Sequence, residues 1–378
     1  MKKLIKMKMI VFILVFVINI FCEFSKTDIE NIILKNISVT KDEIKLYILD
    51  NIEDIPLNSF KPEIKNLLKS KNDNVKIKSA YVLYKIYKDT QAINVIINFV
   101  LDKPKITENM SAVAKAKVYL KNQLRAEAVK MLGELGDKSI VNVLSKTVKD
   151  DDGNVADASY FALALLSQRG VIQQTSELKE FFYEGLKDLN PKVRLQAVKF
   201  LAQLKYEDSV PPLTLRLKDT NKEVVLETIK ALGKIGNKEV LKDLLQFKTH
   251  PEDSYRLTLA ESLGDIAYNI VISSFVDTET LTKIKNVLQS YLNDMNGSVR
   301  VAAARSLLKL NDRTGVEVLK KGLESNDEDI ILYSIESFGK YGNLDDIKYL
   351  SKYTDSANEM VKTAGFVNVL KIYYRTKK

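Results

Sequence analysis

Hydrophobic positions along the chain follow the period of an α-helix, and the same helical unit returns at a fixed interval. In residues 186–219, Val193, Ala197 and Leu201 are four residues apart, which places them on one face of a helix. The same template begins at these anchors: Val75, Leu124, Val155, Val193, Val224, Tyr255, Val299, Ile330 and Val361. Most neighbouring anchors are 31 residues apart. A fixed period of this size indicates a repeat protein whose units bury one another's apolar faces.

Each unit predicts two antiparallel helices, the second of which carries the anchor. Small residues four or five positions after the anchor, such as Ala128 and Ala197, let neighbouring helices approach to about 8–10 Å. Paired glycines mark the end of three second helices, Gly133 with Gly136, Gly233 with Gly236 and Gly339 with Gly342. The second glycine of each pair suits a left-handed C-terminal cap. The prediction for residues 61–378 is therefore all-α: a right-handed α-solenoid, a superhelix of antiparallel helix pairs.

Three intervals are longer than 31 residues and predict insertions. The first, around residues 103–121, predicts one long helix over Glu108–Leu135. The second predicts a polar loop over Gln168–Leu178. The third lies around residues 268–280, where the apolar run Ile270–Val276 extends a helix or forms a protruding contact.

Residues 23–60 fall outside the 31-residue register. They contain two short amphipathic segments, Thr27–Lys35 and Lys41–Leu49. Terminal units of a repeat array need a cover for their outer apolar face. We therefore expect these residues to form an N-terminal helical cap on the first repeat.

Residues 1–22 form a separate leader. Four lysines precede the apolar run Met9–Phe21, which is the pattern of a secretory signal and is short for a spanning helix. Cys22 stands where bacterial lipoproteins carry their lipidated cysteine, although Phe21 before it is larger than the residue usual there. A lipid anchor at Cys22, plain cleavage near it and an uncleaved anchor all remain open. Each predicts an exported chain, in the periplasm or anchored in the cell envelope.

Three stretches carry a resemblance to a known family: NPKVRLQAVKFLAQL, NGSVRVAAARSLLKL and NKEVVLETIKALGKIGN. They resemble the HEAT-repeat family, and more narrowly its short class, similar to the HEAT-like repeats of bilin lyases. The resemblance implies a basic residue after the anchor that pairs with an Asp of the inter-helix turn; the matching residues are Lys76, Arg125, Arg194, Arg256, Arg300 and Lys362. A row of anion-binding residues is the alternative, and we favour the structural ion pairs.

Composition limits the chemistry available to the chain. One His, one Cys and no Trp offer few groups for metal ligation or nucleophilic catalysis. His250 is expected to be a surface residue, and the Asp150–Asp152 cluster to cap the following helix rather than to hold calcium. We expect no catalytic residue, metal or cofactor. Nucleic-acid binding is disfavoured by the export signal and the lack of Trp.

Polar positions on the second helices are the predicted binding face, because these helices usually line the inner curve of such arrays. The candidate residues are Lys130, Lys199, Gln203, Lys230, Lys234, Arg305 and Lys309. The formal charge of +9 is spread along the chain and gives only a mild preference for anionic partners. The predicted function is a non-catalytic scaffold or adaptor for another protein in the bacterial envelope. The alternatives are an enzyme or regulatory subunit of an envelope-modifying enzyme, and a peripheral scaffold on an anionic membrane.

Overall fold

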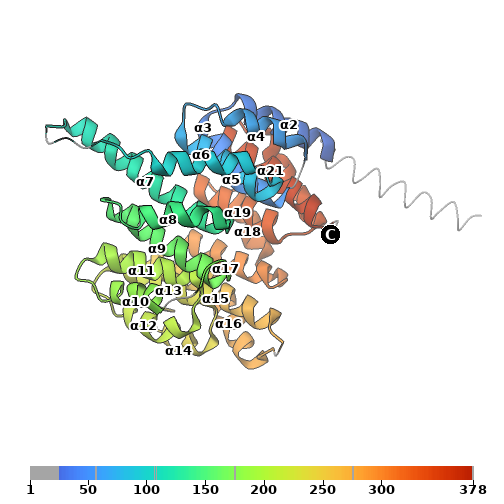
Figure 1. Cartoon of the computed structure of the whole chain (residues 1–378). Helices are drawn as coiled ribbons and strands as arrows, with labels where there is room; N and C mark the ends of the chain where they lie inside the picture. Colours follow the sequence, from blue (N-terminus) through green and yellow to red (C-terminus); the bar gives the residue numbers. More distant parts are fainter. Residues whose placement is uncertain are drawn as a thin grey trace, which may run out of the picture. The chain divides into compact units, whose positions relative to one another are not determined.

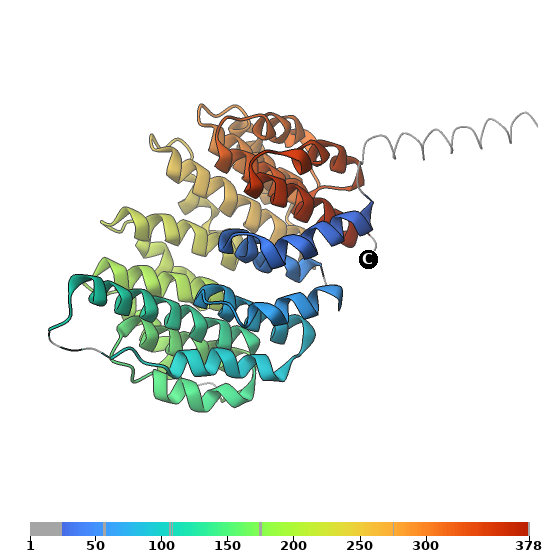
Figure 2. The same ribbon diagram turned by 90° about the horizontal axis from the view of Figure 1, so that it is seen from above.

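The computed structural model describes residues 25–55, 58–105, 107, 109–173, 176–274 and 276–376, and these form helices without any strand. Figures 1 and 2 show these helices in two views. They divide into two compact units. Unit 1 joins the described residues up to 63 with those from 288 onward, and unit 2 comprises residues 64–287. The leader, with Cys22, lies outside the described residues. Among the described helices, none is both long enough and apolar enough to cross a membrane.

Unit 2 contains most of the helix pairs. Its helices are α5 (Asp73–Tyr87), α6 (Thr90–Leu101), α7 (Ala112–Leu135), α8 (Val141–Thr147), α9 (Gly153–Gln168), α10 (Ser176–Gly185), α11 (Pro191–Leu204), α12 (Val210–Arg216), α13 (Lys222–Ile235), α14 (Leu241–Leu245) and α15 (Asp253–Ile272). Two helices cross the division between the units, α4 (Lys61–Leu67) and α16 (Thr278–Tyr291). Unit 1 contains α2 (Lys26–Val39), α3 (Asp42–Asn51), α17 (Gly297–Lys309), α18 (Val316–Leu323), α19 (Glu328–Tyr341), α20 (Ile347–Leu350) and α21 (Glu359–Arg375). The architecture is the predicted all-α solenoid of helix pairs.

Every anchor lies on a second helix, and most of these helices begin in the same way. An Asn or Asp three residues before the anchor accepts hydrogen bonds from the backbone of the first turn; these N-caps are Asn72, Asp152, Asn190, Asn221, Asn296, Asp327 and Asn358. Such a cap stabilises a helix start by about 1 kcal/mol. The helix that carries Leu124 has Lys121 at this position. A Lys side chain cannot accept a hydrogen bond as a cap, so the helix does not begin there. Helix α7 starts instead after Ser111, and the predicted long helix is confirmed with a later start.

The glycines of the second helices have two separate roles. Gly136 and Gly236 adopt the predicted left-handed conformation, with φ of 71° and 80°. The same prediction is wrong for Gly342, whose φ of −71° and ψ of 177° are extended. The first glycine of each pair permits close helix packing: a Cβ on Gly133 would lie 2.7 Å from Ala162 Cβ of α9, and one on Gly233 would lie 2.6 Å from Ser262 Cβ of α15.

The insertions behave largely as expected. The apolar run from Ile270 lengthens α15 to Ile272, and Val271, Ile272 and Val276 remain exposed. Helix α9 ends at Gln168 and α10 begins at Ser176, so the predicted polar loop is shorter than expected.

The N-terminal helices pack against the last repeat, a contact that the sequence interpretation did not predict. Helices α2 and α3 pack against α21 within unit 1. Lys371 Nζ of α21 donates to Asn51 Oδ1 at 2.6 Å, and Tyr374 Oη donates to Glu30 Oε1 at 2.7 Å. Helix α21 is apolar on more than one side, and a continuous run from Thr363 to Ile372 is buried. The neighbouring second helix α19 covers one side of α21, and α2 and α3 cover more of its apolar surface.

Ile33 offers a test of this covering layer. It is buried in α2, 1% exposed, and Ile33→Ala is expected to lower the free energy of unfolding by about 2–5 kcal/mol. Chemical denaturation followed by circular dichroism measures the change. Lys35→Ala on the exposed side of α2 is the control and should change it by less than about 0.5 kcal/mol. Equal small effects would mean that α2 adds nothing to the stability of unit 1.

Candidate functional site

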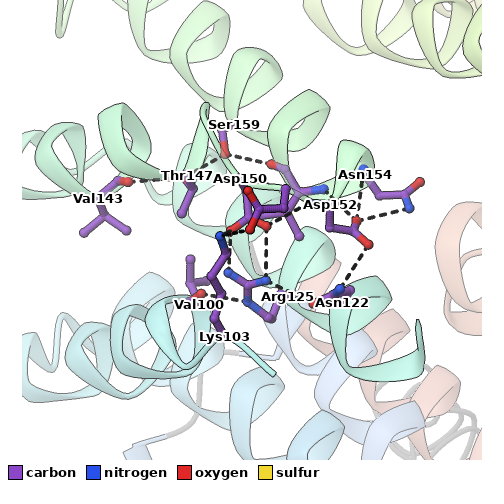
Figure 3. Close-up of polar contacts among 12 residues, drawn as sticks. Val100, Lys103, Asn122, Arg125, Val143, Thr147, Asp150, Asp152, Asn154 and Ser159 are labelled. Atoms are coloured by element: carbon purple, nitrogen blue, oxygen red, sulfur yellow. Dashed lines mark hydrogen bonds and ion pairs between the residues drawn. The ribbon is translucent and has the colours of Figure 1, made fainter. Parts of the chain in front are cut away.

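Two of the predicted ion pairs, those of Arg125 and Arg194, are present and are structural. Arg125 of α7 is 1% exposed, and its Nη2 lies 2.7 Å from Asp150 Oδ2 (Figure 3). Its Nε donates to Val100 O at 2.9 Å and its Nη1 to Asn122 Oδ1 at 3.0 Å. The donors of this guanidinium are therefore directed at protein acceptors rather than at a ligand.

Arg194 repeats the arrangement in α11. Its Nε and Nη2 donate to the two carboxylate oxygens of Asp219 at 2.8 and 2.7 Å. Arg256 and Arg300 donate to the carbonyls of the loops before their helices, His250 O at 2.7 Å and Asp294 O at 2.8 Å. The structural interpretation of these residues is confirmed for Arg125 and Arg194.

Electrostatics in this cluster follow from burial and from the neighbouring cations. Burial by itself would raise the pKa of Asp150, but the Arg125 hydrogen bond, the Asp152 N–H and the charges of Arg125 and Lys103 lower it overall. Asp152 caps α9 by accepting from the N–H groups of Asn154 and Val155, as predicted. Asp151 is exposed and pairs with Lys103 at 2.9 Å. Across the described ranges, no three His, Cys, Asp or Glu side chains are grouped so as to hold a metal ion.

His250 is engaged locally. Its Nδ1 accepts the N–H of Glu252 at 3.2 Å, and its ring lies 3.9 Å from the ring of Tyr255. The imidazole is thus part of the turn before α15.

The predicted binding row is divided between the two units. Lys130, Lys199, Gln203, Lys230 and Lys234 belong to unit 2, and Arg305 and Lys309 belong to unit 1. The guanidinium of Arg305 lies 4.5 Å from the Tyr333 ring centre, and Lys130 pairs with Glu127 at 2.9 Å. Gln203, Lys230 and Lys234 are exposed, and Lys199 is half-buried. A binding role for this row stays a prediction.

A different feature of unit 2 stands out, the joint between α9 and α11. Helices α7 and α9 pack closely, as do α11 and α13, whereas α9 and α11 make few contacts with each other. The residue seven positions after the anchor is small where packing is close, Ala162 in α9 and Ala231 in α13. In α11 this residue is Phe200, whose ring stacks on Phe161 with centroids 4.8 Å apart. An aromatic ring in place of a small side chain separates the two helices.

Helix α10 fills part of this joint with two more aromatic residues. Phe182 is buried edge-on against Phe200, with centroids 5.6 Å apart. Phe181 points outward and stacks on Tyr160 at 4.1 Å, with 36% of its side chain exposed. These contacts leave an open cavity of about 880 Å³ beside α10 and the start of α11. We call it the acidic groove.

The acidic groove combines an apolar floor with a ring of carboxylates. Phe181, Leu189, Val193 and Phe200 supply the apolar surface, and Leu189 is 98% exposed. Its carboxylates are Asp157, Glu180, Glu184 and Asp188, against the single lysine Lys187, which pairs with Glu184 at 2.8 Å. Burial, helped by the charge of Asp152, raises the pKa of Asp157. A cation placed beside this carboxyl group would oppose that shift and stabilise its ionised form.

The sequence interpretation missed this groove. Its signal in the sequence was Phe200, a large ring at a position where the neighbouring repeats carry Ala162 and Ala231.

The class of protein now follows from the fold: an all-α repeat protein with a surface groove at an irregular joint. Residues 179–264 and 284–367 match the family described as HEAT repeats. This match agrees with the HEAT-like repeats expected over these residues. No curated protein matches the chain.

Several solved structures match the chain at low identity. An engineered protein is 19% identical over 92% of this chain and 95% of its own, with a TM-score of 0.34. The complex of CpcE and CpcF of phycocyanin lyase from Nostoc sp. PCC7120 is 15% identical over 73% and 92%, with a TM-score of 0.39. Human deoxyhypusine hydroxylase in complex with glycerol is 18% identical over 76% and 96%, with a TM-score of 0.33. Likeness at this level carries no ligand or activity over to this chain.

Proposed function

We propose that the chain is a non-catalytic scaffold that holds another protein, and that the acidic groove is where it does so. The occupant is a segment with apolar side chains flanked by Lys or Arg. The apolar side chains would cover Phe181 and Leu189, and the cations would lie beside Glu180 and Asp188. HEAT repeats are a fold suited to protein partners, which supports this class of function.

The observation that supports the proposal most directly is exposed aromatic surface inside a ring of carboxylates. Exposed Phe and Leu side chains in one concave place are typical of binding sites, because burial on association releases water from apolar surface. Glu180 and Asp157 have no ion-pair partner among the described residues. Charge of one sign around an apolar floor favours a partner of the opposite sign.

We further propose that this scaffold works in the bacterial cell envelope. The proposal rests on the basic and apolar leader of residues 1–22, with Cys22 as the candidate lipidation site. Cleavage without lipidation and an uncleaved anchor give the same compartment.

One other binding mode has a specific observation in its favour. Lys230 and Lys234 of α13 are exposed, and neither forms an ion pair with another described residue. Together with Lys199 of α11 they would suit an acidic protein or an anionic membrane surface. The two modes need partners of opposite charge, so charge-reversal variants separate them.

The test is affinity capture by the full chain from the native envelope. Glu180→Lys with Asp188→Lys is expected to reduce the amount of captured partner at least tenfold, because the new lysines would repel the basic partner that the carboxylates attract. Lys230→Glu with Lys234→Glu is the matched double reversal and should leave capture unchanged. Loss of capture only in the lysine variant would move the binding face to α11 and α13. Unchanged capture in both variants would reject both surfaces, provided that circular dichroism shows each variant folded.

A further inference from the structure

The first part of α7 is an arm whose chemistry is the opposite of that of the acidic groove. Helix α7 is 24 residues long, and its buried residues begin only at Asn122. Residues 112–121 extend away from the other helices of unit 2 (Figure 1). We call this segment the α7 arm. Its exposed apolar side chains are Val113, Tyr119 and Leu120, which are 67%, 59% and 64% exposed.

The α7 arm is basic as well as apolar. It contains Lys115, Lys117 and Lys121 and no acidic residue. Lys121 pairs with Asp102 at 2.6 Å, whereas Lys115 and Lys117 are exposed and form no ion pair with a described residue. Val113, Lys117 and Leu120 are spaced four and three residues apart, so they share one face of the helix. That face presents a cation between two apolar side chains.

The arm is also poorly stabilised where it stands. The first turn of α7 carries no acidic residue, although carboxylates there would interact favourably with the helix dipole. Cations in the first turns are unfavourable for the same reason. A helical segment of about ten residues without tertiary packing is marginal in water. Contact with an acidic, apolar surface would place carboxylates near the helix N-terminus and its lysines, and would supply the missing packing.

We propose that the α7 arm of one copy docks into the acidic groove of a second copy of this chain. Lys117 would lie beside Glu180, and Val113 and Leu120 would cover Phe181 and Leu189. The two surfaces therefore match in charge and in apolar character.

A second copy is the occupant because the arm cannot reach its own groove as a helix. The arm is continuous with the half of α7 that packs tightly on α9, and Arg125 fixes that half through its buried ion pair with Asp150. Bending the arm back would break α7. Joining two different surfaces gives a head-to-tail contact, which leads either to a closed pair or to a longer chain of copies.

This inference rests on the proposed function, since it names the partner of the same groove. The experiment uses the full chain with a benzophenone side chain at Val113, on the docking face of the arm, mixed from ¹⁵N-labelled and unlabelled protein. Light is expected to join labelled to unlabelled chains, with the new bond in peptides spanning residues 180–200. Benzophenone at Lys242, an exposed residue of α14, is the control and should give no such product. Absence of mixed-label product, or bonds to other regions only, would overturn the inference.

A charge swap then tests the pairing itself. Lys115→Glu with Lys117→Glu should reduce cross-linking at least tenfold, and so should Glu180→Lys with Asp188→Lys. The chain with all four changes should cross-link with itself again, because the charges are complementary once more. Failure of that rescue in a folded chain would contradict the pairing. Loss of self-association together with retained, groove-dependent capture of another protein would reject this inference and leave the proposed function standing.

Discussion

Asp150→Asn is expected to lower the free energy of unfolding by about 3–5 kcal/mol, one of the largest effects of any single substitution in the chain. The side chains of Arg125 and Asp150 are 1% and 4% exposed, and they face each other at 2.7 Å. Asn keeps the shape of Asp but removes its charge, so the guanidinium would stay buried without its counter-ion. Urea unfolding followed by circular dichroism measures the loss.

Asp151→Asn is the control, one residue further along the chain. Asp151 is exposed, and within the described part of the chain it forms an ion pair with Lys103 alone, so its replacement should cost no more than about 1 kcal/mol. The pKa of Asp150 is lowered in the folded chain, so its stabilisation is present above the ordinary value of 3.8 and is lost as pH falls below it. The difference between wild type and Asp150→Asn should therefore shrink in acid. Equal effects of the two substitutions would mean that the buried pair adds nothing.

Gly233→Ala is expected to destabilise the chain by about 1–3 kcal/mol, although Ala is the better helix former. The added Cβ would lie 2.6 Å from Ser262 Cβ and 2.7 Å from Ser262 Cα. The second atom is backbone, so rotation of a side chain cannot relieve the clash, and α13 and α15 must separate. Thermal or urea unfolding measures the change.

Gly153→Ala provides the opposite result for the same chemical change. Gly153 lies in the first turn of α9, and no atom stands within 4 Å of its added Cβ. This substitution should leave stability unchanged or raise it by up to about 1 kcal/mol. A similar sign for both substitutions would show that close approach of the helices is not the reason for Gly233.

The repeat architecture could be predicted from the sequence because it depends on local signals. The anchors, the Asn and Asp caps such as Asn221, and the left-handed Gly236 act within a few residues of chain. Their spacing then fixes which helices are neighbours. The Arg125–Asp150 pair was predictable in kind through the family resemblance, since its partners lie at a repeated distance along the chain.

Contacts between distant segments could not be predicted in the same way. Nothing near Ile33 or Ile37 shows that α2 lies against α21, because an apolar stripe does not identify its partner. The sequence of α21 gives one indication of this contact. Phe366 and Val367 are apolar residues outside the face that packs near Gly339, so α21 needs a second neighbour to bury them. The prediction of a left-handed cap at Gly342 was wrong because the turn that follows, rather than the glycine itself, sets its extended backbone.

The acidic groove was missed for a related reason. Phe200 and Phe182 fit the hydrophobic pattern of their helices, and a pattern of apolar and polar residues treats Phe and Ala alike. Only their size opens the joint between α9 and α11. The exposed orientation of Phe181 and the convergence of Asp157 with Glu180 depend on that joint, so they appear only in three dimensions.

Hydrogen–deuterium exchange of the full chain, with and without the partner that it captures, tests the central claim most directly. The account predicts slower exchange in the peptides of α10 and the start of α11, from Glu180 to Phe200. Peptides around Lys230 and Lys234 of α13 should exchange as before. Protection confined to α13, or no change around α10 in a saturated complex, would contradict the acidic groove as the binding site.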